Sequence, residues 1–388
     1  MKTKLFKKTI VIFVVLLAVS TTSFADKYPP ENASVLYYKA FMLYKPDDAI
    51  ESMLADFTNG KIVSNEKIKE FLNSGQNRRI INTITDASQI PNCDWGLNYS
   101  EGFEMENPSL SSLRNLSRLI LADAKIHAEN GDYKTAFSRC ITAKKMAIHT
   151  GDELLISYLV SVAINALANK SIQDILNGNI DIQTLKWLKS ELEDIQKIKL
   201  VAKDALINDF RIASNTKRGK LKDVPVESVT EDPNLQKKLN EVINNQSLFE
   251  ENLKYWEQYM LSVADAFDLP YLQAVSKIKG IESASPQQPK ENAKAVITAI
   301  FAPPAVKIFT ISIRDQSNEN ALRTAVDIYI RNAQNTKLPD SLTESSPKDM
   351  FSGRDFEYVK TKEGFILRCR QKDLDKDKIQ EYEFKLKR

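Results

Sequence analysis

The 388-residue chain holds 54 Lys and Arg residues against 51 Asp and Glu, with three cysteines, two histidines and 11 glycines. This near-neutral balance gives no global electrostatic reason to bind nucleic acid, because that binding depends on clustered basic side chains. Three cysteines are too few for a disulfide scaffold, and a chain of this length can bury a core without one. The glycine-poor composition and long apolar-periodic stretches predict a mainly α-helical protein.

Residues 1–25 have the pattern of a signal peptide. Four lysines precede the apolar run 9–19, and Ser23-Phe24-Ala25 places small residues at a cleavage site before Asp26. The apolar run is shorter than the roughly 20 residues that span a bilayer. We therefore expect an exported protein of the periplasm or cell envelope, or a secreted one, with membrane attachment only if this segment stays uncleaved. Loss of the four lysines changes the formal charge from +3 to −1, since 3 − 4 = −1.

Residues 26–213 are expected to form an N-terminal helical domain. In the stretch 33–57, one helix places Val35, Tyr38, Met42 and Leu43 on or near one face. Pro46-Asp47-Asp48 suits the start of the next helix.

The strongest apolar period begins at Ser109 and ends at Asn130-Gly131, a left-handed helix end. Asp132 can cap the following helix. Its stripe is Tyr133, Phe137, Cys140, Ile141, Lys144 and Ile148. The Gly-Asp-Tyr turn resembles that of a tetratricopeptide helix pair, but it occurs clearly once. Two more helices follow, an apolar one over LLISYLVSVAINALA and one over 181–200. The pattern predicts helical hairpins packed as a bundle or short solenoid.

Residues 214–234 are polar and contain two prolines, which predicts a loop before a helical region over 235–317. Within 235–260, apolar residues are spaced alternately four and three apart, as in a coiled-coil seam. The seam residues are Leu235, Leu239, Val242, Gln246, Phe249, Leu253, Trp256 and Met260. We favour a long helix docked in the same bundle. A homodimer formed through this helix is the alternative.

The last region, 318–388, begins as a helix and then changes period. Three short runs alternate apolar and charged residues, ending in Tyr382, Phe384 and Leu386. Period-two alternation predicts a small C-terminal antiparallel β-meander with one face on a core. Lys362-Glu363-Gly364 would make its first turn.

The stretch NCDWGLNYSEG at 92–102 is the one place that looks like a constructed site. Cys93 is the only cysteine outside an apolar stripe, which makes it the candidate nucleophile of a cysteine-dependent hydrolase. A disulfide between Cys93 and Cys140 is a second alternative in an exported protein. We favour a binding or structural loop, in which Trp95 is buried between helices, Asp94 bonds loop amides and Gly96 permits a tight turn.

The remaining titratable residues predict no catalytic or metal site. His127 and His149 lie near the ends of two consecutive antiparallel helices, roughly 25 Å apart, so they cannot share a metal. The sequence contains no phosphate-binding loop, dinucleotide fingerprint or nucleophile elbow. We therefore predict no catalytic residues, no metal and no cofactor.

Two stretches together resemble a known family. Cys93-Asp94-Trp95-Gly96 with the Gly-Asp-Tyr hairpin resembles a group of exported, uncharacterised helical proteins common in planctomycete bacteria. Leu338-Pro339-Asp340-Ser341-Leu342 and Phe351-Ser352-Gly353 resemble that group's usual ending. This ending is also similar to the C-terminal portion of type II secretion pseudopilins. The resemblance implies export and a helical fold with a small sheet, and the pseudopilin likeness implies a component associated with the secretion apparatus.

From these observations we expect a non-enzymatic envelope protein that scaffolds or binds another protein. The helical-hairpin pattern and the missing catalytic set favour this function. The cysteine-dependent hydrolase and the secretion-apparatus component are its alternatives.

Overall fold

The computed structural model describes residues 28–105, 107, 109–151, 154–198, 200–215, 225–284 and 293–386. The N-terminal helices are α2 (Ala33–Leu43), α3 (Asp48–Thr58), α4 (Glu66–Asn73), α5 (Gly75–Ser88), η1 (Tyr99–Glu104), α6 (Ser109–Glu129), α7 (Tyr133–Thr150), α8 (Leu155–Ile175), α9 (Ile182–Gln196) and α10 (Ala202–Ser214). The later elements are α12 (Val226–Val229), α13 (Pro233–Asn244), α14 (Gln246–Ala266), α15 (Tyr271–Ala284), η2 (Ala293–Ala295), α16 (Val296–Phe301), α17 (Ala305–Asn335), β1 (Glu357–Lys360), β2 (Gly364–Asp373) and β3 (Lys378–Lys385). The predicted signal peptide, 1–25, lies outside the described residues.

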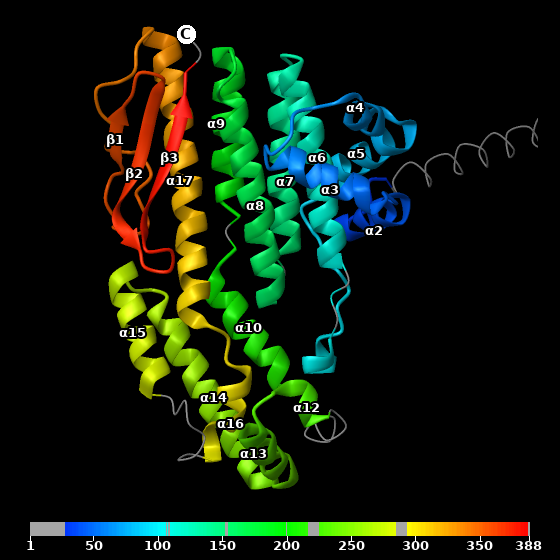
Figure 1. The fold of residues 1–388 in the computed structure, drawn as a ribbon, viewed down its shortest axis with the longest axis vertical. Coiled ribbons are helices and arrows are strands. Elements are labelled where there is room, and N and C mark those ends of the chain that lie inside the picture. The colour runs from blue at the N-terminus through cyan, green and yellow to red at the C-terminus, as the bar shows by residue number, and fades with distance from the viewer. Residues whose placement is uncertain are drawn as a thin grey trace, which may run out of the picture.

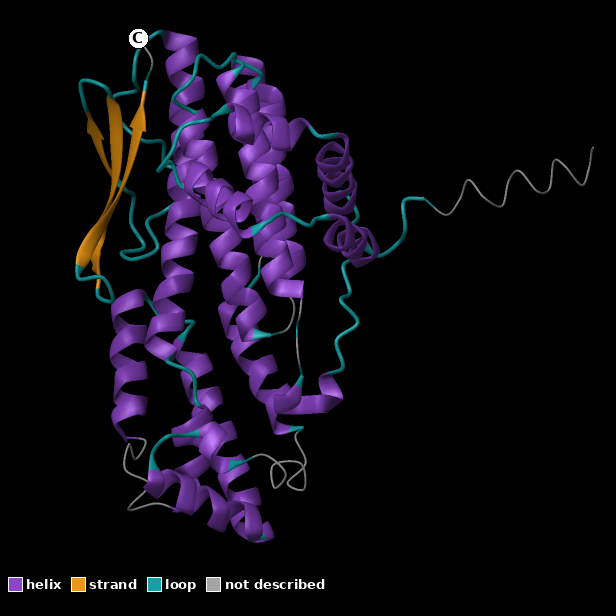
Figure 2. Cartoon of the chain, turned by 45° about the vertical axis from the view of Figure 1, so that its right-hand side comes forward, coloured by secondary structure: helices purple, strands orange, loops and turns teal. Residues whose placement is uncertain are grey.

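The predicted fold class is confirmed, because a mainly helical body carries a C-terminal three-stranded antiparallel sheet. Figure 1 shows α7, α8, α9 and α17 running along the long axis of the molecule, with the sheet on one side and α2 to α5 on the other. In the view of Figure 2, the sheet forms a separate layer beside the helices. Helices α10 and α12 to α16 make up the lower part of the molecule in the view of Figure 1.

The hairpin α6–α7 is formed at the predicted turn. Gly131 has a left-handed φ of 79°, and the carboxylate of Asp132 accepts the N–H of Thr135 at 3.2 Å to cap α7. The hydroxyl of Tyr133 accepts the N–H of Asn179, which joins this turn to the connection between α8 and α9. Helices α6, α7 and α8 pack against one another as the central layer of the bundle.

The face of α2 that carries Val35, Tyr38, Met42 and Leu43 is its exposed face. Val35 and Met42 are 54 % and 70 % exposed, and Tyr38 and Leu43 are exposed as well. The buried side is Ala33, Ser34, Leu36, Tyr37 and Ala40. Helix α2 packs against α5, and small residues on that side let the two helices approach closely. Both sides of α2 are apolar, so periodicity alone did not identify the buried one.

The single helix expected over 235–260 is wrong, because it breaks at Asn245. Asn245 is extended (φ −116°, ψ 112°), and its side chain accepts the N–H of Leu248 to cap α14. Leu239 and Val242 before the break and Phe249, Trp256 and Met260 after it are nonetheless buried, whereas the seam residue Gln246 is exposed. Trp256 packs edge-on against Phe210 of α10 at 4.9 Å between ring centroids. These seam residues therefore pack inside the chain's own bundle, and a homodimer through this helix would need the same residues.

Two predicted region boundaries fall elsewhere in the structure. Helix α17 begins directly after Pro303-Pro304 and runs through position 318 without a break. It contacts α8, α9, α10 and α15, so the regions predicted as 26–213 and 235–317 share one apolar core. The short helix α12 lies inside the predicted loop 214–234, and 216–224 of that loop lie outside the described residues.

The sheet has the strand order β1-β2-β3, as the alternation predicted. Its inner face packs on α17, where Tyr329 meets Phe365 and Phe384 edge to ring. Arg314 of α17 pairs with the fully buried Asp373 at the end of β2, at 2.8 Å. The last strands are therefore fixed to the bundle by aromatic packing at one end and by an ion pair at the other.

Within the described residues, two helical segments are long and apolar enough to cross a membrane, Leu155–Ile175 and Ala293–Asn335. About half of each lies buried inside the protein, as in the core helix of a soluble domain. Length and composition alone do not assign either segment to a membrane.

Candidate functional site

The Cys-Asp-Trp loop is fastened to the start of α2 by Asn32. The side chain of Asn32 accepts the N–H of Asp94 at 2.9 Å and donates to the Asp94 carbonyl at 2.8 Å. The Asp94 carboxylate accepts the N–H of Gly96, which has a left-handed φ of 67°. These bonds give the loop one defined conformation over Asp94 to Gly96.

Trp95 connects this loop to two helices. Its side chain is only 6 % exposed, and its indole N–H donates to the His149 carbonyl at the end of α7 at 2.7 Å. Its ring stacks on Tyr37 and Phe41 of α2, with centroids 5.6 and 6.2 Å apart. The indole therefore provides apolar contact on α2 and a hydrogen bond on α7.

The imidazole of His149 belongs to the same cluster. Its Nδ1 lies 3.0 Å from the hydroxyl of Tyr37, and the ring also hydrogen-bonds the backbone of Ile90. Burial lowers the pKa of His149 to about 4, so the ring is neutral at physiological pH. The contacts with Tyr37 and Ile90 hold the His149 ring in one orientation within the loop cluster.

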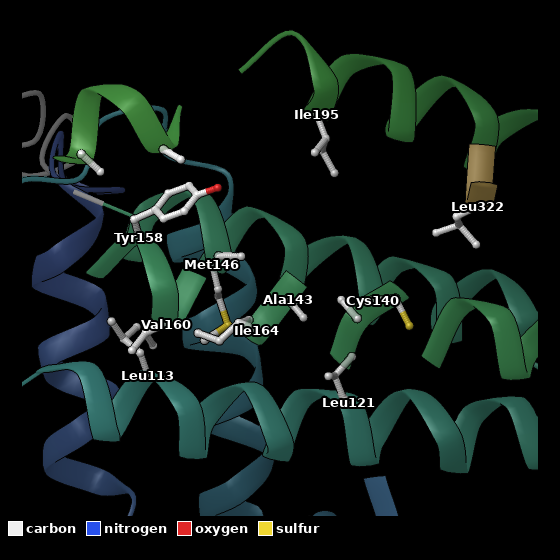
Figure 3. Close-up of a cluster of buried hydrophobic side chains, with 14 of the residues drawn as sticks. Leu113, Leu121, Cys140, Ala143, Met146, Tyr158, Val160, Ile164, Ile195 and Leu322 are labelled. Atoms are coloured by element: carbon white, nitrogen blue, oxygen red, sulfur yellow. The ribbon is translucent and has the colours of Figure 1, made fainter. Parts of the chain in front are cut away.

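The alternative of a disulfide between Cys93 and Cys140 is contradicted, because the structure contains no such bond. Figure 3 shows Cys140 inside the apolar cluster near Leu121 and Ala143, and burial there raises the pKa of its thiol.

The two histidines lie in the last turns of two consecutive helices, His127 in α6 and His149 in α7. His127 binds the Asp132 carboxylate at 3.0 Å beside the Gly131 turn, whereas His149 lies near the C-terminal end of α7. Among the residues that the structure describes, no group of three or more His, Cys, Asp and Glu side chains converges as metal ligands would.

A second cluster, which the sequence analysis missed, lies between α7, α8 and α17. Lys144 is 1 % exposed, and its ammonium donates to the side-chain oxygens of Asn165 and Asn169, each at 2.7 Å. It also donates to Glu319 Oε2 at 2.6 Å. These three bonds match the three donors of an ammonium group. We call Lys144, Asn165, Asn169, Asp315 and Glu319 the polar cluster.

The two carboxyl groups of the polar cluster differ in their electrostatics. Burial raises the pKa of Asp315 to about 6, and the nearby Glu319 charge adds to this effect. The amide of Asn165 donates to Asp315 at 2.9 Å. Burial also disfavours ionisation of Glu319, but the Lys144 ammonium outweighs it and holds the pKa of Glu319 below its usual value.

A cleft of about 200 Å³ opens beside the polar cluster. Lys144, Asn165, Asp315 and Glu319 line it, together with the apolar side chains of Ile148, Val162, Ile195, Leu200 and Met350. The Oε1 atom of Glu319 is buried and has no hydrogen-bond partner among the described residues. A buried ionised oxygen without a donor is costly, so Glu319, a lining residue of the cleft, keeps one acceptor without a partner among the described residues.

The Cys-Asp-Trp loop borders a neighbouring hollow of about 500 Å³. Cys93, Asp94 and Trp95 line that hollow, and it shares Tyr158 and Leu200 with the cleft. The loop predicted from the sequence therefore lines a hollow that shares two lining residues with the cleft beside the polar cluster.

Sequence signals for the polar cluster exist but are weak. Lys144 falls on the apolar stripe of α7, where a charged residue must be buried with a partner. Asn165 and Asn169 are four apart in an otherwise apolar helix, as are Asp315 and Glu319 in α17, so each pair shares a helix face. Nothing local shows that these three helices meet.

Comparison of this chain with family models, with curated proteins and with solved structures finds no match.

Proposed function

We propose that this protein is an exported ligand-binding protein whose cleft between α7, α8 and α17 holds a small organic molecule. The main support for this proposal is Glu319 Oε1, a buried acceptor without a hydrogen-bond donor among the described residues. Its residue lines a cavity that contains further polar groups. An apolar cavity with a few convergent polar groups is the usual form of a small-molecule site. At about 200 Å³, the cleft suits a molecule smaller than a drug.

The polar cluster supports binding in preference to covalent catalysis by Lys144. All three ammonium donors of Lys144 are used by Asn165, Asn169 and Glu319. A nitrogen that donates three hydrogen bonds has no lone pair for nucleophilic attack. Its function is to hold the carboxylate of Glu319 in one position beside the cleft.

Three probes of similar size and different charge test the proposal, namely butylammonium, butan-1-ol and butyrate. Titration of each into the 15N-labelled protein, followed by amide chemical shifts, should reveal millimolar binding of at least one at the cleft. Val162→Phe fills the cleft and should abolish those shifts. Ala163→Phe is the matched control, since Ala163 is the next residue of α8 and is exposed. If none of the three probes shifts resonances around the cleft, the proposed function is wrong.

A protein-binding scaffold is the second candidate, and the exposed apolar side of α2 favours it. Val35 and Met42 project into solvent although both are large and apolar. Chemical cross-linking in envelope fractions should recover one specific protein with the wild type. The variant Val35→Asp with Met42→Glu should lose that protein. Equal recovery by both forms would contradict the scaffold function.

A further inference from the structure

We propose that the ligand of the cleft carries a protonated amine, which binds between the carboxylates of Asp315 and Glu319. This inference rests on the proposed ligand-binding function and names the chemical class of the ligand. Both residues lie on α17, four positions apart, so their side chains share one helix face and both line the cleft.

The charges at the cleft favour a cation. The Lys144 ammonium and the Glu319 carboxylate form an ion pair at 2.6 Å and neutralise each other. Asp315 then remains as an unbalanced acidic group. The titratable groups that interact electrostatically with Asp315 are Lys144 from α7, Glu319 from α17, Tyr158 from α8 and Tyr382 from β3, and Arg323 of α17 interacts with Glu319. Ionised Asp315 therefore gives the polar cluster a net negative charge.

The hydrogen bonds point to the same class of ligand. The donors of Lys144 are directed at oxygens of the polar cluster, and the amides of Asn165 and Asn169 donate to Asp315 and Glu319. Glu319 Oε1 is an acceptor that still lacks a donor among the described residues. An ammonium ligand supplies three donors, whereas a carboxylate ligand would bring further acceptors to a site that needs donors.

The apolar lining of the cleft defines the rest of the ligand. Ile148, Val162, Ile195 and Leu200 belong to this lining. An alkyl chain of a few carbons can lie on these side chains while its ammonium group reaches the two carboxylates. The cleft therefore fits a short alkylammonium ion.

The test compares dissociation constants of butylammonium, butan-1-ol and butyrate for the full chain by the same amide-shift titration. We expect butylammonium to bind about tenfold more tightly than either of the others, because its hydrogen bonds to carboxylate are charge-assisted. Asp315→Asn keeps the shape of the side chain and should remove most of this preference. Asn165 can still donate to the new amide oxygen, which favours a folded variant.

The outcomes separate this inference from the proposed function. Butan-1-ol or butyrate binding at the cleft as tightly as butylammonium would overturn the amine assignment while leaving a ligand-binding protein. An unchanged preference for butylammonium in Asp315→Asn would also overturn the assignment. Failure of all three probes would overturn both. The Val162→Phe and Ala163→Phe variants show in each case whether the signal comes from the cleft.

Discussion

Lys144 and Glu319 are 175 residues apart in the chain, yet their side chains form an ion pair of 2.6 Å in the interior of the bundle. The pair fixes α17 to α7 and positions the polar side of the cleft. A buried ion pair adds little stability by itself, because both groups lose their hydration. A buried ion pair that adds little stability and lies beside a cleft is typical of a binding site.

Removal of one member of the Lys144–Glu319 ion pair should strongly destabilise the protein. We expect Lys144→Met to lower the free energy of unfolding by about 3–5 kcal/mol, because it leaves Glu319 buried without its counter-ion. Urea denaturation measures this change. Lys145→Met is the matched control, since Lys145 is more exposed and its nearest acidic partner, Glu191, lies 3.8 Å away; it should cost about 1 kcal/mol or less. Similar losses in the two variants would show that the interior pair is not formed.

Asp315 should reduce stability at neutral pH. Its folded pKa of about 6 lies above the ordinary aspartate value of 3.8, so its stabilising contribution is complete below about pH 4 and is lost as the pH rises through 6. The change in the free energy of unfolding caused by Asp315→Asn should therefore be more favourable at pH 7 than at pH 4, by up to about 3 kcal/mol. Thermal unfolding of both proteins at the two pH values measures this difference. A variant that is equally destabilised at both would refute the raised pKa.

His149 should make stability depend on pH in the opposite direction. Its folded pKa of about 4 is below the ordinary histidine value of 6.5, so the folded state binds fewer protons than the unfolded state between these values. Stability should fall by up to about 3 kcal/mol as the pH drops from 6.5 to 4. Subtracting the pH profile of His149→Gln from that of the wild type isolates this contribution. Parallel profiles would mean that His149 is accessible to protons in the folded protein.

The three thiols should differ in reactivity. Cys140 and Cys369 are buried, and Cys93 is half-buried, with no disulfide among them. A thiol reagent should modify Cys93 in the native protein and reach the other two only after unfolding, because burial keeps their thiols protonated and covered. Peptide mass mapping after labelling identifies each site. A Cys93–Cys140 peptide linked before reduction would contradict the structure.

Trp95 should contribute to the free energy of unfolding through both its ring and its N–H. Trp95→Phe keeps aromatic contact with Tyr37 but loses the hydrogen bond to the His149 carbonyl, which should cost about 1 kcal/mol. Trp95→Ala should cost about 3–5 kcal/mol, since it also leaves a cavity. Urea denaturation gives both values. Equal stability of the Phe and Ala variants would show that ring packing contributes nothing.

The sequence predicted elements whose signals are local. The hairpin at Gly131 and the alternating strands around Phe365 needed only turn chemistry and period. The buried side of α2 could not be predicted in this way, because Val35 and Met42 are as apolar as the residues that pack on α5. The helix break at Asn245 could not be predicted, because the apolar spacing continues on both sides of it.

The candidate site was predicted only in part. The Cys-Asp-Trp loop was recognised because its unusual residues are adjacent in the chain. The polar cluster was not recognised, because Lys144, Asn165 and Glu319 come from three helices and their convergence depends on the packing of α17 against α8. The local signs were Lys144 on the apolar stripe of α7 and polar residues at a spacing of four in α8 and α17.

Proton release on ligand binding tests the central claim most directly. Calorimetric titration of butylammonium at pH 6, in buffers of different ionisation enthalpy, counts the protons exchanged. Asp315 is about half protonated at this pH, and the alkylammonium stays charged, as a lysine would. The account predicts release of about half a proton by the wild type and none by Asp315→Asn. Binding without proton release, or equal release by both proteins, would contradict it.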